Sequence, residues 1–184
     1  MILDRFFFAV LPPAETAGRI AAYARALGLM HAPVTAERLH MTLAITDDFK
    51  QGECPAAYVE TLLRAGERIA APPFAMTLGR LAVGTKSVLA LPGEGRAGGK
   101  AVYDCITQAM AAMRAPLRAR ARYSPHMTLS YDEAVKPGGL RKLDLGWLVT
   151  EVVLIHSVVG LHRHEVLNRW PLVEPPVRQA SFAF

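Results

Sequence analysis

The tetrapeptide His40-Met41-Thr42-Leu43 occurs twice in this chain, returning as His126-Met127-Thr128-Leu129. Each copy lies in a short run of strand-forming residues, at 39–46 and 126–131. Because successive side chains of a strand point to opposite faces, the histidine and threonine of each copy share one face, and the methionine and leucine share the other. Each copy therefore predicts a strand with an apolar face for a core and a polar face that presents an imidazole and a hydroxyl. Two such strands brought together would form a pocket with two histidines and two threonines.

The rest of the chain forms a weak internal repeat, in which a predicted helix precedes each motif strand. Aromatic and β-branched runs predict further strands at residues 5–11, 74–83, 86–91, 151–159 and 166–173. Helical spacing of apolar residues predicts helices at 14–29, 54–71 and 101–113. Polar or glycine-rich stretches predict loops at 47–51 and 160–165, turns at 84–85 and 136–139, and a flexible joint at 92–100. This order predicts an α+β fold whose pseudo-two-fold symmetry places the two motifs face to face.

Length and composition indicate a soluble globular protein. Of the 184 residues, 52% are hydrophobic and 20% are charged, which provides ample material for a core. No run of about 18 apolar residues occurs, so we expect no membrane-spanning helix and no membrane partner. Charged residues inside the first apolar run argue against a signal peptide, and two cysteines in unlike contexts suggest free thiols in a reducing cytoplasm.

We therefore expect a cytoplasmic monomer without an obligate protein partner. It should form one domain over residues 1–184, with approximate sequence halves at 1–92 and 101–173, strands that can swap between lobes, and a tail at 174–184.

The charge of the chain is mildly basic, with a formal net charge of +5 and a pI near 9.5. Such a charge is compatible with an anionic substrate or RNA, but it is also common in proteins that bind neither. Four arginines precede the second motif, at positions 114, 118, 120 and 122. They are either a solvated helix end or a rim that attracts phosphate, and the sequence supports both interpretations equally.

Two histidines that face one bound group suit general acid–base catalysis. Their ordinary pKa of about 6.5 lets one ring be neutral while the other is protonated near neutral pH. In-line attack at phosphorus needs a base at the entering oxygen and an acid at the leaving oxygen, and a hydroxyl on the same face can donate to the phosphate oxygens. This chemistry requires neither a metal nor a cofactor.

Other sites are less well supported by the sequence. The chain has no HExxH motif and no cysteine pair at ligand spacing, although Asp47, Asp48 and Asp132 near the motif ends leave a metal possible. Ser130 and Ser157 lack the context of a hydrolase nucleophile.

At these motifs the chain resembles the 2H phosphoesterase superfamily, specifically the RNA 2′,3′-cyclic phosphodiesterases of the 2′-5′ RNA ligase family. The opening RFFFAVLPP is similar to the first strand of that family, and VVLIHSVVGLHRHEVLNRWPL is similar to its closing hairpin. The resemblance implies two α+β lobes, each with an antiparallel sheet and flanking helices, on either side of an active-site cleft. It implies metal-independent opening of a 2′,3′-cyclic phosphate to a 2′-phosphomonoester. By position, His40 would be the general acid, His126 would be the base, and Thr42 and Thr128 would hold the phosphate.

The chain departs from the family pattern at Tyr131, where many members carry arginine. If that arginine neutralises phosphate charge, Arg122 or Arg163 would have to replace it. Tyr131 itself would either stack on a base or be an ordinary aromatic residue at a strand edge. Two alternatives therefore stand beside hydrolysis: a protein that binds RNA ends with little or no turnover, and 2′-5′ ligation of RNA ends.

Overall fold

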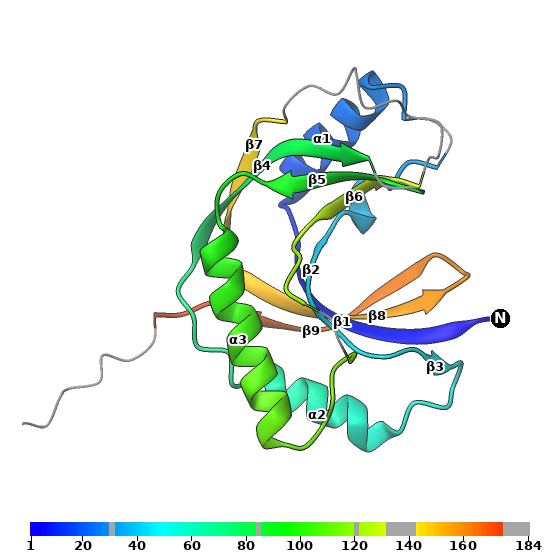
Figure 1. Ribbon diagram of the computed structural model, residues 1–184, viewed down its shortest axis with the longest axis vertical. Coiled ribbons are helices and arrows are strands. Elements are labelled where there is room, and N and C mark those ends of the chain that lie inside the picture. Colours follow the sequence, from blue (N-terminus) through cyan, green and yellow to red (C-terminus); the bar gives the residue numbers. More distant parts are fainter. Residues whose placement is uncertain (30–31, 84–85, 120–121, 132–142, 175–184) are drawn as a thin grey trace, which may run out of the picture.

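The computed structural model describes residues 1–29, 32–83, 86–119, 122–131 and 143–174 (Figure 1). These residues form an α+β fold, as the sequence predicts. The strands are β1 (Leu3–Val10), β2 (Met41–Ile45), β3 (Phe49–Lys50), β4 (Phe74–Val83), β5 (Val88–Pro92), β6 (Met127–Ser130), β7 (Leu145–Val149), β8 (Glu151–Val159) and β9 (Arg163–Pro171). The helices are α1 (Ala14–Ala26), α2 (Ala56–Gly66) and α3 (Arg96–Ala112), with a short 3-10 helix η1 (Ala36–Arg38).

All strands in the described part of the chain join one antiparallel sheet in the order β7-β4-β5-β6-β2-β1-β8-β9, with β3 paired to β1. The two motif strands β2 and β6 meet at the centre through a single residue pair, Met41 opposite Met127. The sheet curls on either side of this junction, which gives the two lobes visible in Figure 1. Strands from both parts of the sequence contribute to each lobe, because β8 and β9 extend β1 while β4 and β5 lead to β6. The domain boundaries themselves stay a prediction.

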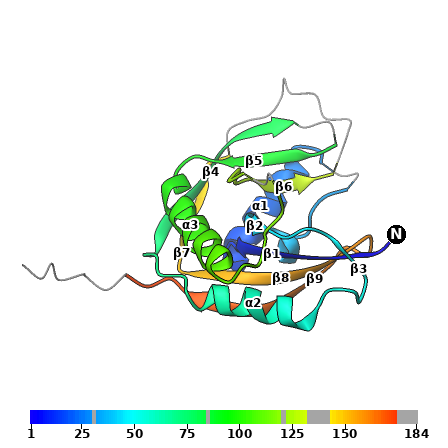
Figure 2. The same cartoon turned by 60° about the horizontal axis from the view of Figure 1, so that its bottom comes forward.

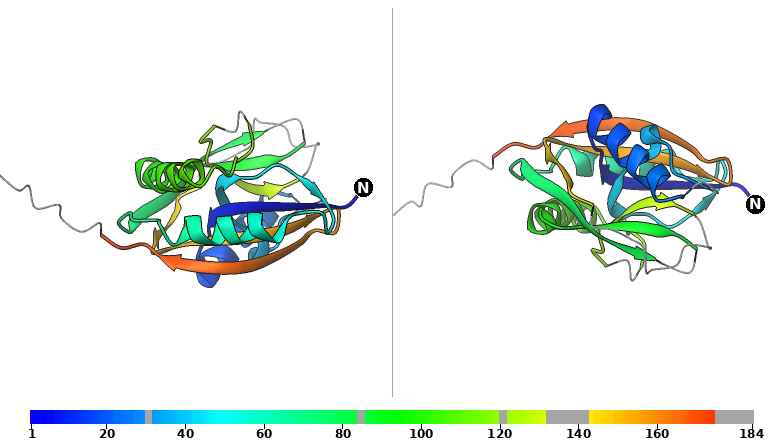
Figure 3. Two further views of the ribbon diagram at one scale, coloured as in Figure 1. Left: turned by 90° about the horizontal axis from the view of Figure 1, so that it is seen from below. Right: turned by 90° about the horizontal axis from the view of Figure 1, so that it is seen from above.

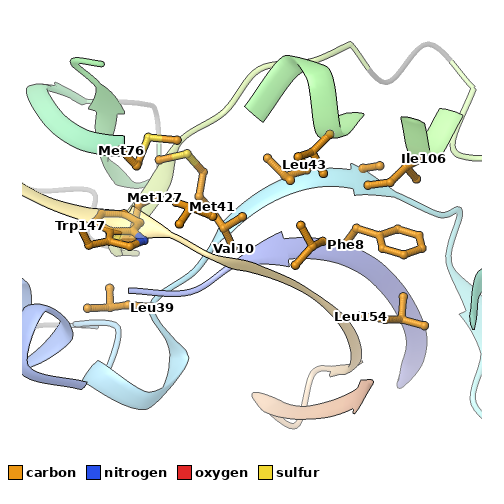
Figure 4. Close-up of a cluster of buried hydrophobic side chains, with 14 of the residues drawn as sticks. Phe8, Val10, Leu39, Met41, Leu43, Met76, Ile106, Met127, Trp147 and Leu154 are labelled. Carbon is orange, nitrogen blue, oxygen red and sulfur yellow. The ribbon is translucent and has the colours of Figure 1, made fainter. Parts of the chain in front are cut away.

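Strand β1 is buried on both faces, as its almost continuous hydrophobic sequence predicts. Phe6, Phe8 and Val10 enter the main core, whereas Phe7 and Ala9 join a smaller cluster on the opposite face. Figure 4 shows the main core, where side chains of β1 and β2 meet those of α3 and β8. Burial of a large apolar side chain contributes about 1.5–3 kcal/mol, so β1 is a principal source of stability.

The helices cover the sheet on different sides. Helix α1 contacts η1, β6 and β7, while α2 contacts α3, β8 and β9 (Figures 2 and 3). Among the described residues, no helix is both long enough and apolar enough to cross a membrane.

The predicted joint at 92–100 is wrong in its second half, because α3 already begins at Arg96. The glycines of this stretch are needed for close packing. A Cβ at Gly98 would collide with the Phe74 ring, and one at Gly99 would collide with the Tyr123 hydroxyl. The glycines therefore let α3 approach β4 and the segment before β6.

Three strand boundaries also differ from the prediction. The expected loop at 47–51 contains β3, which pairs with β1, and β7 is an additional strand in which Leu145, Trp147 and Val149 alternate with more exposed residues. The expected loop at 160–165 is short, since β9 already begins at Arg163. The predicted turns at 84–85 and 136–139 and nearly all of the tail at 174–184 lie outside the described residues.

Candidate active site

The register of the two motif strands determines how their polar side chains meet. Met41 opposes Met127, and both methionines are fully buried. Antiparallel strands run in opposite directions, so the flanking positions place His40 opposite Thr128 and Thr42 opposite His126. The two histidines are then diagonal neighbours across the pair, a relation that separates Cα atoms by about 7 Å. This arrangement leaves space for a small group such as phosphate between the imidazoles.

Both imidazoles are held in the same way by the backbone. Nδ1 of His40 lies 2.7 Å from the carbonyl oxygen of Arg38, and Nδ1 of His126 lies 2.8 Å from that of Ser124. A carbonyl only accepts hydrogen bonds, so Nδ1 carries the proton in each ring. Nε2 is therefore the nitrogen that can accept a proton when the ring is neutral and donate one when it is charged.

The four motif side chains, two histidines and two threonines, line one cavity of about 590 Å³. The cavity wall also contains four arginines and two further histidines, namely Arg5, Arg38, Arg118, Arg122, His162 and His164. None of the described residues that line it is an aspartate or a glutamate. Because guanidinium groups stay charged at all physiological pH values, the cavity favours an anionic ligand.

His40 lies in a cluster of three rings that has no counterpart at His126 among the described residues. Its ring stacks on Phe7 with centroids 4.9 Å apart, and the His164 ring contacts it edge-on at 5.1 Å. Burial lowers the pKa of His40. The hydrogen bond to the Arg38 carbonyl opposes this effect, and the charges of Arg38 and His126 lower the pKa further. Burial, together with His40, Arg38 and His162, lowers the pKa of His164 to about 4. Both rings are therefore neutral in the free protein near pH 7.

Two of the cavity arginines share the carboxylate of Asp48, a residue that does not itself line the cavity. Arg5 contacts Asp48 through Nε at 2.6 Å and through a second nitrogen at 2.7 Å, and Arg118 contacts Asp48 at 2.6 Å. The hydrogen bond from Arg5 is the main reason that the pKa of Asp48 is lowered. This cluster connects β1 to the segment before the second motif and partly neutralises both arginines.

The remaining candidates differ in position. Arg122 and Tyr131 line the cavity, and Tyr131 is 53% exposed. Arg163 is not part of the cavity wall. It neighbours His164 on β9 and therefore points to the other face of the sheet, where its charge helps to lower the pKa of Asp4. Arg163 is thus poorly placed to replace the missing family arginine.

Sequence reasoning does not select Arg5, Arg38, His162 or His164 as site residues, although all four line the cavity. The sequence pattern favours a loop surface for His162 and His164 and leaves a role at the rim of a pocket open for both. In the structure His164 lies on β9, whereas His162 lies in the turn before it, so the alternation of a strand does not place the two histidines together. Among the described residues, no group of three or more histidine, cysteine, aspartate or glutamate side chains is positioned to hold a metal ion.

Comparison with known proteins agrees with this architecture. E. coli LigT in its apo form superimposes with a TM-score of 0.74 at 26% identity, covering 95% of this chain and 100% of LigT. E. coli LigT complexed with 3′-AMP gives a TM-score of 0.77 at 24% identity, covering 94% and 99% of the two chains. A protein of Thermus thermophilus gives 0.69 at 22% identity, with coverages of 91% and 97%.

Sequence comparison gives the family. No curated protein matches the sequence. The family model described as the 2′-5′ RNA ligase superfamily matches residues 12–160, a span that includes both histidine motifs and most of the sheet. The chain therefore belongs to the 2′-5′ RNA ligase superfamily of 2H phosphoesterases and has the fold of LigT.

Proposed function

We propose that this protein hydrolyses a 2′,3′-cyclic phosphate, at an RNA end or on a nucleotide, to a 2′-phosphomonoester without a metal. The observation that carries the proposal is the pair of imidazoles, His40 and His126. They immediately precede two paired strands, at diagonal positions about the Met41–Met127 pair, and each is fixed through Nδ1 in the same way. They line a cavity with four arginines and, among the described residues, no carboxylate, as a phosphate diester anion requires.

In this mechanism one imidazole takes a proton from water as the water oxygen attacks phosphorus. The bond between phosphorus and the 3′ oxygen breaks, and the other imidazole gives its proton to that oxygen, so the phosphate remains on the 2′ oxygen. Thr42 and Thr128 donate hydrogen bonds to the non-bridging oxygens, where negative charge accumulates. We assign the base to His126 and the acid to His40.

The environment of His40 is compatible with the role of acid only when substrate is bound. Burial favours its neutral form in the free protein. A phosphate anion next to the ring favours the charged form, because an opposite charge at close range raises the pKa of a histidine. Substrate binding would therefore favour uptake of a proton from solvent by His40, and this is the proton that the leaving oxygen needs. Solved LigT structures contain phosphate, 3′-AMP, ATP and NADP+, which supports a nucleotide as the ligand class.

The experiment is hydrolysis of a nucleoside 2′,3′-cyclic phosphate and of an RNA with the same end, in EDTA, with separation of 2′- and 3′-phosphate products. We expect the 2′-phosphate. His40→Asn and His126→Asn should each lower kcat/KM about 10²–10⁴-fold, since each removes one proton-transfer group. His156→Asn is the matched control, because His156 bonds Asp4 at 2.8 Å and does not line the cavity. Full activity in either motif variant would refute the mechanism.

The role of acid can be separated from that of base with an aryl phosphodiester. Its leaving group departs without protonation, so the acid variant should lose much less activity on it than on the cyclic phosphate. We expect this partial recovery for His40→Asn and not for His126→Asn. Recovery in the opposite variant would reverse the assignment.

One observation favours a second candidate function, an RNA-end binding protein with little turnover. Tyr131 stands where many family members have arginine, and it is exposed at the cavity wall. Tight binding of a 2′-phosphorylated RNA end, with no hydrolysis at any pH, would support this alternative. A joined 2′-5′ product from RNA ends would instead indicate ligation.

A further inference from the structure

We propose that Arg38 binds the substrate phosphate in this cavity, beside Thr42 and Thr128, and supplies the guanidinium that position 131 lacks. The inference rests on the proposed function for the identity of the substrate. The observation behind the inference is a buried Nε of Arg38 that has no hydrogen-bond partner in the described part of the chain. It is independent of the two histidine motifs, because Arg38 precedes the first of them.

Arg38 ends the 3-10 helix η1, two residues before His40. Its carbonyl oxygen holds Nδ1 of His40, and its side chain lines the same cavity. Its Nε is buried and has no hydrogen-bond acceptor among the described residues. Leaving a buried donor without a partner costs free energy, so this guanidinium is available to donate a hydrogen bond to an anionic ligand.

The other cavity arginines are less suited to this role. Arg5 and Arg118 already bond to Asp48. Arg122 lies on the side of the second motif, and it is the competing candidate that an experiment must test. Arg38 therefore combines a position beside His40 with an unused hydrogen-bonding group.

The charge of Arg38 also affects the neighbouring histidines. It lowers the pKa of His40 and of His164, and all three side chains line the same cavity. A phosphate anion bound by Arg38 would offset this repulsion and favour protonation of His40. One side chain would thus couple phosphate binding to the charging of the proposed acid. The chemical class of ligand is a phosphate diester or monoester anion, which a guanidinium can bind through two oxygens at once.

Arg38→Met tests this role without disturbing how His40 is held, because the bond to Nδ1 comes from the backbone of residue 38. Methionine keeps an apolar stem and removes the charge. We would measure binding of adenosine 2′-monophosphate by calorimetry, kcat and KM on the cyclic phosphate, and the pKa of His40 by NMR. Arg122→Met is the competing variant. Arg80→Met is the control for net charge, since Arg80 is exposed on β4 and does not line the cavity.

We expect Arg38→Met to bind the nucleotide about 10- to 100-fold more weakly, as for loss of a charge-assisted hydrogen bond. The pKa of His40 should rise, Arg38→Lys should recover part of the affinity, and Arg80→Met should behave as wild type. Wild-type affinity in Arg38→Met, together with a loss in Arg122→Met, would overturn the inference. So would a wild-type protein that does not bind the nucleotide. Weaker binding in Arg38→Met without hydrolysis by the wild type would refute the proposed activity and uphold the Arg38 site.

Discussion

Replacing His164 by asparagine should reduce the dependence of folding stability on pH. In the folded protein the pKa of His164 is lowered to about 4, mainly by burial, whereas an unfolded histidine titrates near 6.5. As the pH falls below 6.5, the unfolded chain binds a proton that the folded protein does not. This site therefore favours the folded state fully above pH 6.5, and the advantage is lost as the pH falls toward 4.

The magnitude follows from the two pKa values. At pH 5 a shift of this size corresponds to about 2 kcal/mol of lost stability relative to pH 7. Because the ring is only about half buried, solvent screening reduces the expected effect to about 1 kcal/mol. Urea denaturation at pH 7 and pH 5 would measure the free energy of unfolding. The difference between the two pH values should be about 1 kcal/mol smaller in His164→Asn than in wild type.

Two further variants separate titration from packing. His164→Phe retains a ring against His40 and Phe7 but cannot titrate, so it should show the same reduced pH dependence as His164→Asn. His162→Asn changes an exposed residue at the turn of the hairpin. It should keep most of the wild-type pH dependence, because His162 lowers the pKa of His164 less than burial, His40 or Arg38 does. If the His164 variants lose as much stability as the wild type between pH 7 and pH 5, burial of His164 does not control its protonation.

Three other substitutions give independent tests, two at the motif threonines and one at a glycine. Thr42→Val and Thr128→Val should each lower kcat on a cyclic phosphate about 10²-fold with folding retained, because each removes one donor to the developing phosphate charge; unchanged kcat in both would argue against phosphate contacts by the threonines. Gly66→Ala should lower the free energy of unfolding by about 1–3 kcal/mol, because a Cβ there collides with the Trp170 ring, which α2 packs against. Gly18→Ala in α1 is its control, since a Cβ there meets nothing within 4 Å, and thermal denaturation should show equal or higher stability.

Patterns that depend on strand geometry were predictable from the sequence. The alternation of the two motifs gave the polar and apolar faces of β2 and β6, and the continuous apolar run at 5–11 gave burial of β1 on both faces. These predictions succeed because the direction of a side chain in a strand follows from its position alone. The register of β2 against β6, and hence the diagonal placement of the histidines, came only from the structure.

Contacts between distant segments were less accessible. Arg5 reaches the cavity because β1 lies beside β2, and Asp48 then holds it together with Arg118. His164 reaches His40 because β9 pairs with β8 and β8 pairs with β1. Neither pattern has a local signature, since each depends on the order of strands in the sheet. The glycines at 98 and 99 show the same limit, because a small residue required for packing is indistinguishable in sequence from one that makes a loop flexible.

The two motifs are alike in sequence, but acid–base catalysis requires that they differ in protonation. The backbone treats them equally, since a carbonyl two residues earlier holds Nδ1 of each imidazole. The difference comes from elements outside the repeated tetrapeptides. Phe7 of β1 and His164 of β9 bury the ring of His40, and Arg38 adds a positive charge beside it. In the proposed mechanism the repeat would provide two proton-transfer groups. The surrounding strands lower the pKa of His40, so a bound phosphate anion would have to offset this effect before His40 could donate a proton.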